Sequence, residues 1–295
     1  MKFYWWVKVI LGISIIFLSI VGMIYFSNQT EIKQENSVIT TPKHDRKNSK
    51  KRKIVSPDKE IIEINKKEKN DEDLKKRKNI KKELKDNVKK SNIDPTKPMV
   101  ALTFDDGPNP VSTPHIIEIL KNSHAKATFF DLGVLILNYP DIVKNEESIG
   151  CEVGSHTFDH VDLNKLDENG IKYEIEKSKE AFNLVLGHDF KLLRVPYGNI
   201  NDLVKKTINY PLINWNIDTL DWKIRNKDAI INELRNKGDL NGKIILMHSI
   251  YPSTADAMEV MVPELIQKGY QLVTVSELFE AKGVDLKSGT IYYGF

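Results

Sequence analysis

The chain has 295 residues, a formal net charge of +3 and a hydrophobic content of 40%. This length suits two average domains, or one barrel-sized α/β domain with appendages. The single cysteine, Cys151, excludes an intramolecular disulfide framework. A domain of about 200 residues does not need one, because it can bury a sufficient core.

An apolar run occupies residues 9–26, close to the roughly 20 residues that a helix needs to cross a bilayer core. Aromatic residues flank this run, and Lys2 and Lys8 lie on its N-terminal side. A cleaved signal peptide begins in the same way, but no small-x-small cleavage site follows Phe26. We therefore expect residues 1–8 in the cytoplasm, a single-pass anchor over 9–26 and an extracellular remainder in the cell membrane.

Residues 27–95 contain no aromatic side chain and are dense in lysine, arginine, glutamate and aspartate. Such a segment cannot bury enough apolar surface to offset the entropy lost on ordering, so it predicts a disordered or solvated-helical tether. Its positive charge could attract an anionic wall polymer or lipid headgroups, or the segment could be a plain soluble spacer. Nucleic acid is not an expected partner, because the tether lies outside the membrane in this topology.

Residues 96–295 alternate strand-like apolar runs with helix-like patterns, which indicates βαβ units and a largely parallel sheet. About seven strands suit a barrel better than an open sheet, and reactive side chains of such barrels collect at the carboxyl ends of the strands. The strand-like runs are 99–104, 127–130, 151–154, 192–195, 212–217, 243–247 and 271–275. The helix-like runs are 114–121, 134–145, 163–186, 202–208, 228–237 and 255–268.

Asp105 and Asp106 end the first of these strands, just before the turn at Gly107-Pro108. Neighbouring side chains of a strand point to opposite faces, but a strand end followed by a turn lets both carboxylates reach one cleft. Taken alone, the pair is as typical of a solvated turn as of a catalytic site.

Four further strand ends carry polar side chains. The first holds His156 and His160, which we expect to share one face of a helical turn because they are four residues apart. The other three ends carry Arg194-Val195-Pro196-Tyr197-Gly198, Asp218-Thr219-Leu220-Asp221-Trp222 and His248.

Together with residues 103–108, these segments resemble in order the motifs of the polysaccharide deacetylase family, the carbohydrate esterases built on the NodB homology domain. The resemblance covers the whole of residues 96–295. It implies a distorted (β/α) barrel and a hydrolase of linear amides that removes acetyl groups from N-acetylated or O-acetylated sugars with a metal ion.

Asp106, His156 and His160 would offer a divalent metal one carboxylate and two imidazoles, leaving positions open for water and a substrate carbonyl. The alternatives for such a set are a solvated turn or a ferrous oxygenase. The family resemblance points to zinc, with cobalt, manganese, nickel or iron as alternatives.

By the same resemblance, Asp105 is the general base and His248 is the general acid that protonates the leaving amine. Arg194 orients the base and Asp221 orients the acid. For these last two, the alternative is an ordinary buried ion pair.

The backbone N–H of Tyr197 would hold the oxyanion, with Pro196 fixing the turn that aims it and bordering the substrate. Trp222 and Leu246 match positions that form the apolar slot for the acetyl methyl group, although core packing is an alternative for both.

We expect a deacetylase of an extracellular glycan, with the N-acetylglucosamine of peptidoglycan as the leading substrate. N-acetylmuramic acid, chitooligosaccharide, exopolysaccharide and O-acetyl esters stay open, and so does a wall-binding module without catalysis. We expect the protein to be monomeric. Three departures from the family's usual residues leave the substrate preference open. Asp131 stands where an apolar residue is expected, Val195 replaces a proline, and Ser249 replaces an aspartate.

Overall fold

The structure is a computed structural model of the chain and describes residues 93–295. The predicted cytoplasmic segment (1–8), the anchor (9–26) and nearly all of the tether (27–95) lie outside these residues. Between residues 93 and 295, no helix combines the length and apolar character needed to span a bilayer.

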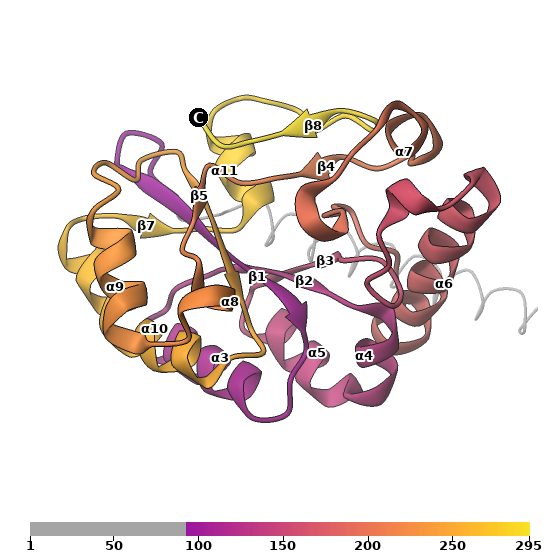
Figure 1. Ribbon diagram of the computed structural model, residues 1–295. Coiled ribbons are helices and arrows are strands. Elements are labelled where there is room, and N and C mark those ends of the chain that lie inside the picture. Colours follow the sequence, from indigo (N-terminus) through magenta and orange to yellow (C-terminus); the bar gives the residue numbers. More distant parts are fainter. Residues whose placement is uncertain (1–92) are drawn as a thin grey trace, which may run out of the picture. The chain divides into compact units, whose positions relative to one another are not determined.

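Short strands alternate with helices along the described residues (Figure 1). The strands are β1 (Met99–Gly107), β2 (Thr128–Asp131), β3 (Glu152–Ser155), β4 (Leu212–Ile213), β5 (Ile217–Asp218), β6 (Ile244–His248), β7 (Gln271–Leu272) and β8 (Ile291–Tyr292). The α-helices are α3 (Ser112–Asn122), α4 (Gly133–Asn138), α5 (Pro140–Ser148), α6 (Glu168–Leu186), α7 (Asp202–Thr207), α8 (Asp221–Ile224), α9 (Lys227–Arg235), α10 (Pro252–Gln267) and α11 (Val275–Ala281). Two 3₁₀ turns are η1 (Leu163–Lys165) and η2 (Pro196–Gly198).

All strand pairs among these residues are parallel. One sheet has the order β3-β2-β1-β6-β5, with β7 paired to the start of β1, and β4 pairs with β8. Isolated bridges from Leu193 to Ser155 and Leu212 join β3 to β4. Because β4 leads directly into β5, the pairings run in a circuit around the domain.

The predicted parallel α/β fold is confirmed, but several elements differ in detail. The run 192–195 makes only the two bridges at Leu193. The run 212–217 divides into β4 and β5, because Asn214 N–H bonds to Tyr292 whereas Asn216 N–H bonds to Ile244 on the other side.

The predicted helix 134–145 breaks at Tyr139, which has φ −132° and ψ 54°. Proline disfavours the helical conformation of the residue before it, and Pro140 starts α5. The sequence does not predict the short elements α8, α11 and β8. None of them is longer than seven residues, and a segment this short carries too little periodicity to be recognised.

Helices surround the strands in the order α9, α10, α3, α5, α4, α6 and α7, each in contact with the next (Figure 1). The even-numbered residues of β1 up to Phe104 pack among these helices, whereas Met99 and Ala101 pack with residues of other strands and of α11. Thr103 and Asp105 continue the second set by strand alternation. The fold therefore directs Asp105 to the inside of the circuit, at its carboxyl end.

Candidate active site

Three potential metal ligands converge where β1 and β3 end. The Oδ1 atom of Asp106 lies 3.1 Å from Nε2 of His160 and 3.4 Å from Nε2 of His156. All three ligand atoms lie within 4.8 Å of one another. The structure thus brings together the three residues that the sequence predicted as a metal site.

A bulge in β1 places the two adjacent carboxylates in one site. The register with β2 shifts between Asp105 and Gly107, and Asp106 has a left-handed φ of 69°. A bulge redirects one side chain of a strand, so Asp106 joins Asp105 on the same side. The Oδ2 atom of Asp105 consequently lies 3.8 Å from Nε2 of His156.

The two histidines do not lie on a helical turn, so that prediction is wrong. They belong to a loop in which Thr157 and His160 adopt left-handed φ values of 72° and 67°. Hydrogen bonds to side chains from outside the loop replace the helical ones. The buried Glu174 carboxylate on α6 accepts N–H bonds from Phe158 at 3.1 Å and Asp159 at 3.3 Å.

The orientation of His156 is fixed by its backbone surroundings. Its Nδ1 lies 2.8 Å from the carbonyl oxygen of Arg194, and a carbonyl can only accept, so Nδ1 carries the proton. Nε2 is then free to act as a ligand, which is the arrangement found around histidines that bind metals.

The charges at this site suit a cation. Burial alone would raise the pKa of Asp106, but the His156 and His160 imidazoles outweigh burial and hold that pKa below its ordinary value. Asp106 Oδ1 is buried and makes no hydrogen bond of regular geometry within residues 93–295. One carboxylate oxygen and two imidazole nitrogens aimed at a common point fit a divalent metal.

Arg194 holds Asp105 from inside the strand circuit. The guanidinium is fully buried, and its Nη1 donates at 2.7 Å to both Asp105 Oδ1 and Thr103 Oγ1. Its other nitrogens donate to the carbonyls of Ile213 at 3.0 Å and Asn214 at 3.4 Å. Each nitrogen therefore has a partner, and the Asp105 carboxylate keeps one oxygen free toward His156.

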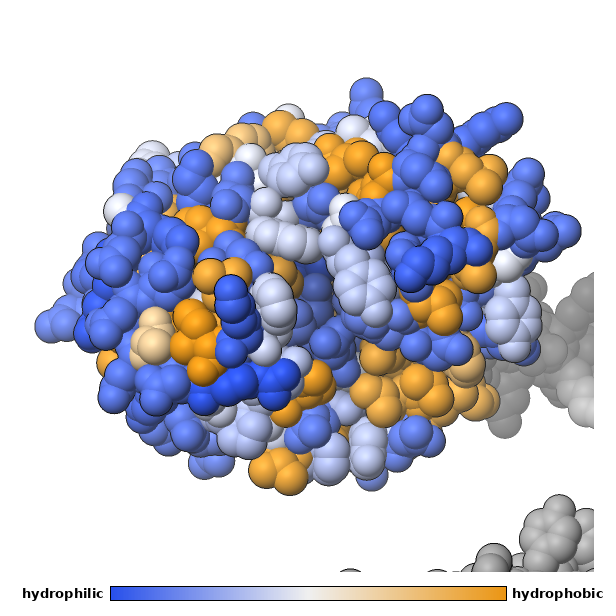
Figure 2. Space-filling model, in the orientation of Figure 1, coloured by the Kyte–Doolittle hydropathy of each residue, from blue (hydrophilic) through white to orange (hydrophobic). Residues whose placement is uncertain are grey.

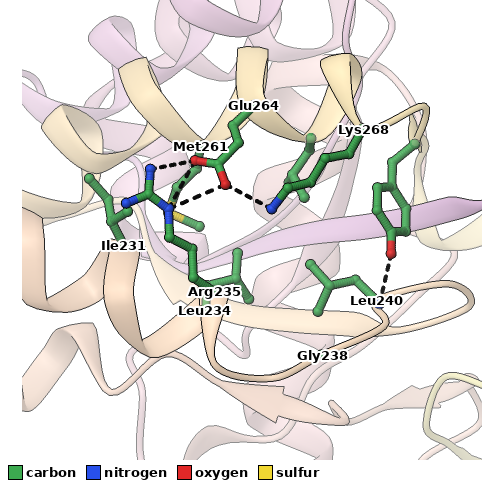
Figure 3. A pocket seen from close by; sticks show the side chains of 10 residues that line it. Ile231, Leu234, Arg235, Gly238, Leu240, Met261, Glu264 and Lys268 are labelled. Carbon is green, nitrogen blue, oxygen red and sulfur yellow. Dashed lines mark hydrogen bonds and ion pairs between the residues drawn. The ribbon is translucent and has the colours of Figure 1, made fainter.

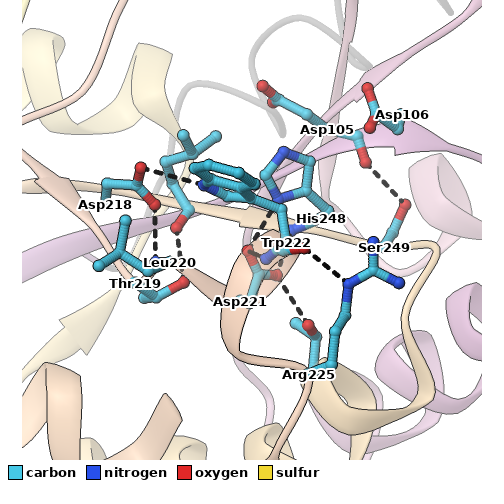
Figure 4. Close-up of polar contacts among 12 residues, drawn as sticks. Asp105, Asp106, Asp218, Thr219, Leu220, Asp221, Trp222, Arg225, His248 and Ser249 are labelled. Atoms are coloured by element: carbon cyan, nitrogen blue, oxygen red, sulfur yellow. Dashed lines mark hydrogen bonds and ion pairs between the residues drawn. The ribbon is translucent and has the colours of Figure 1, made fainter.

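Asp221 holds His248 in a similar way (Figure 4). Its Oδ1 accepts a hydrogen bond from Nδ1 of His248 at 2.8 Å, and its Oδ2 accepts from the His248 backbone N–H and from Thr254. Burial alone would lower the pKa of His248. Asp221, with smaller contributions from Asp105 and Asp106, reverses this and raises the pKa to about 9.

The predicted substrate-binding residues lie at different depths. Trp222 is 46% exposed and its Nε1 donates to Asp218 at 3.3 Å, whereas Leu246 is buried in β6 opposite Thr103. Tyr197 has a left-handed φ of 62° and its ring stands 4.9 Å from that of His160. Pro196 is buried beside it.

Sequence reasoning missed several residues that support the site. Thr254, in the first turn of α10, binds Asp221 at 2.7 Å. Thr103 binds Arg194, and Glu174 fixes the histidine loop. Each is an isolated polar residue in an apolar or amphipathic pattern, and only Thr103 lies within a motif that could have indicated a role.

A second set of acids is buried at the end of β2 and in α5. Asp131 and Glu146 are both fully buried and neither makes an ion pair within the described part of the chain. Burial raises the pKa of Glu146 well above its ordinary value and that of Asp131 to about 7. Asp131 is the residue that stands where the sequence predicted an apolar one.

The candidate site opens on a hollow in the surface. Figure 2 shows this hollow near the middle of the face drawn in Figure 1, where the arrowhead of β1 ends. A separate depression lies between α9 and α10, where Arg235, Glu264 and Lys268 form ion pairs over apolar side chains (Figure 3). It contains none of the residues discussed above.

Comparisons with known proteins identify the family and its relatives. Residues 92–211 match the family model described as polysaccharide deacetylase. A peptidoglycan-N-acetylmuramic acid deacetylase of Bacillus subtilis is 38% identical over 194 residues, 66% of this chain and 41% of that protein. A peptidoglycan-N-acetylglucosamine deacetylase of Listeria monocytogenes is 37% identical over 198 residues, 67% of this chain and 42% of that protein. The chain thus spans less than half the length of these two relatives.

Shorter relatives are matched over more of their length. A peptidoglycan-N-acetylglucosamine deacetylase of Bacillus cereus is 38% identical over 188 residues, 61% of this chain and 68% of that protein. Among solved structures, a family 4 acetyl xylan esterase from Clostridium thermocellum, in complex with a cobalt ion, has a TM-score of 0.63 and 26% identity. That match covers 66% of this chain and 98% of the esterase.

Proposed function

The chain belongs to the polysaccharide deacetylase family, and from that premise we propose that it is a metal-dependent hydrolase removing N-acetyl groups from an extracellular glycan. One observation carries this proposal. The ligand set of Asp106, His156 and His160 shares its site with a carboxylate held by Arg194 and an imidazole held by Asp221. Amide hydrolysis needs a base and an acid on opposite sides of the reacting carbonyl, and this site supplies both.

Asp106, His156 and His160 would hold the metal, for which we propose zinc. When bound, a divalent ion polarises a carbonyl oxygen and lowers the pKa of water, which is the activation that amide hydrolysis requires. Asp105 accepts the proton of the attacking water through its free carboxylate oxygen. Arg194 keeps that carboxylate in place by holding the other oxygen.

His248 donates the proton to the nitrogen of the leaving amine. The proton sits on Nε2, because Nδ1 is engaged by Asp221. A pKa raised to about 9 keeps this imidazole protonated at neutral pH, as a general acid requires. We assign the backbone N–H of Tyr197 to the oxyanion, and Trp222, Leu246 and Pro196 to the acetyl group.

For the substrate we propose peptidoglycan, with deacetylation at N-acetylglucosamine. The relatives from Listeria monocytogenes and Bacillus cereus bear names for this activity, which supports the choice. The Bacillus subtilis relative is named for N-acetylmuramic acid instead, so the neighbouring sugar of the same polymer is the second candidate.

We also propose that residues 9–26 anchor the protein in the cell membrane, with the tether carrying a monomeric catalytic domain, residues 96–295, to the wall outside. The apolar run and its flanking lysines support this topology. Mass spectrometry of the membrane fraction should detect peptides from the first residues. A mature protein that begins near Thr30 would contradict the anchor.

Acetate release tests the activity. The full chain, purified and supplied with zinc, should release acetate from peptidoglycan or N-acetylglucosamine oligomers, and chelation should abolish the release until metal is restored. A metal-loaded protein that releases no acetate from either glycan would refute the proposed function.

A further inference from the structure

We infer that Arg225 is a specificity residue that binds a carboxylate on the glycan, next to the sugar being deacetylated. This inference rests on the proposed function and adds an acidic group to the substrate that the site selects. Such a group distinguishes peptidoglycan from a neutral glycan such as a chitooligosaccharide.

The guanidinium of Arg225 is held in one orientation beside the site. Its Cζ lies 3.5 Å from the centre of the Tyr251 ring, and its Nε donates at 2.7 Å to the carbonyl of Trp222. Figure 4 shows the side chain rising beside Trp222 toward the segment after His248. An arginine stacked on an aromatic ring loses less entropy when it binds a ligand.

The backbone of Arg225 is tied to the catalytic machinery. It ends α8 with a left-handed φ of 49°, and its N–H donates at 3.1 Å to the carbonyl of Asp221. The ring of Tyr251, on which the guanidinium lies, is 5.7 Å from the ring of His248. The positive charge is therefore separated from the proposed general acid by a single aromatic ring.

The terminal nitrogens of this guanidinium are available to a ligand. Arg225 is exposed, and the Trp222 carbonyl is its only side-chain hydrogen-bond partner within residues 93–295, where it makes no ion pair. Four N–H donors remain on a planar fork. That fork matches the two oxygens of a carboxylate, a pairing stronger and more selective than contact with sugar hydroxyls.

Two carboxylate sources occur on a peptidoglycan strand, the lactyl group of muramic acid and the acids of its stem peptide. The test uses peptide-free N-acetylglucosamine–N-acetylmuramic acid oligomers with the lactyl carboxylate free, and the same oligomers with it converted to a methylamide. A third glycan carries stem peptides. Values of kcat/KM for acetate release and Kd for each glycan are measured with the full chain.

For Arg225→Gln we expect the preference for free carboxylate over methylamide to fall about tenfold, the worth of one charge-assisted hydrogen bond. The loss should lie in KM and Kd rather than kcat, because the carboxylate is remote from the reacting bond. Arg225→Lys keeps the positive charge but loses the planar pair of N–H donors, so it should retain only part of the preference for free carboxylate. A loss confined to the peptide-bearing glycan would assign the carboxylate to the stem peptide.

Lys223→Gln is the matched control, because it removes the same charge from an exposed side chain of α8. It should leave the preference within about twofold. If both variants lost the preference for free carboxylate equally, the preference would depend on overall charge and not on Arg225, and the inference would be overturned. An Arg225→Gln variant with unchanged preference would also overturn it. A wild-type chain that shows no turnover but binds the free-carboxylate glycan through Arg225 would refute the proposed function alone.

Discussion

Asp105 and the pair formed by Asp131 and Glu146 are buried to a similar extent, but different groups face them. Asp105 lies near the carboxyl end of β1, with the Arg194 guanidinium 2.7 Å away. Asp131 ends the neighbouring β2, where its register partner is Gly107, and the group against it is a second acid, Glu146. One carboxyl therefore has a buried cation and the other two have each other.

This difference shows that the effect of burial on an acid depends on the groups that face it. A cation and well-placed donors offset the loss of water around an ionised carboxylate. Two acids without a cation instead retain a proton, because both cannot be ionised at short range in a dry environment. The contact with Arg194 is consistent with the role of base proposed for Asp105, whereas Asp131 and Glu146 have no such contact within the described residues.

The largest effect is expected when the ionisable group of Asp105 is removed. Asp105→Asn keeps the shape and the contact with Arg194 but cannot accept a proton, so turnover should fall by about 10²–10⁴-fold. Because Asp105 is not one of the three ligands, the metal content should stay near that of the wild type. Acetate release and metal analysis of the same preparation check both expectations.

Asp106→Ala is the matched variant one residue away. It removes the carboxylate ligand, so metal binding and turnover should be lost together. Equal metal loss in the Asp105 and Asp106 variants would contradict the division of roles between the two acids.

A second experiment removes the cation and leaves Asp105 as isolated as Asp131. Arg194→Met should lower the free energy of unfolding by about 3–5 kcal/mol, because a buried carboxylate loses its partner. The double variant Arg194→Met/Asp105→Asn should recover part of this loss, since no charge is then left without a partner. Urea denaturation at pH 7 measures the free energy of unfolding of the wild type, of Arg194→Met and of the double variant. A double variant no more stable than Arg194→Met would show that charge pairing does not hold Asp105.

The sequence predicted the surroundings of Asp105 better than those of Asp131 and Glu146. Asp105 and Arg194 lie in ordered motifs at strand ends, and in a parallel sheet such ends meet at one edge. The family resemblance implied their pairing across 89 residues, and the parallel sheet explains how the two strand ends come together. For Asp131, the sequence indicates only an acid at a position where an apolar residue is expected. Glu146 lies in the amphipathic helix α5, and its sequence context does not indicate that it faces Asp131.

Local backbone geometry was also not predictable from the sequence. The helical spacing of His156 and His160 predicted a helical turn, because periodicity does not reveal left-handed residues such as Thr157. The loop depends on Glu174, whose contacts arise only when α6 packs on it. The division of 212–217 into two strands likewise follows from partners brought by distant segments.

The smallest expected effect concerns the neutral pair. Asp131→Leu/Glu146→Met replaces two acids without a cation by apolar side chains of similar size, which should raise the free energy of unfolding by about 1–4 kcal/mol at neutral pH. In the wild type, the folded chain keeps a proton that the unfolded chain releases near pH 4. The stability from this pair is thus complete at low pH and is lost as the pH rises toward about 7, the raised pKa of Asp131.

The double variant lacks this titration, so its advantage over the wild type should grow between pH 4 and pH 7. Urea denaturation at several pH values, with equal metal loading, measures the advantage. Glu118→Met is the control because it removes an exposed carboxyl from α3 and should leave the pH dependence unchanged. An advantage that does not vary with pH would mean that the pair is ionised and balanced by another group, and the contrast with Asp105 would then fail.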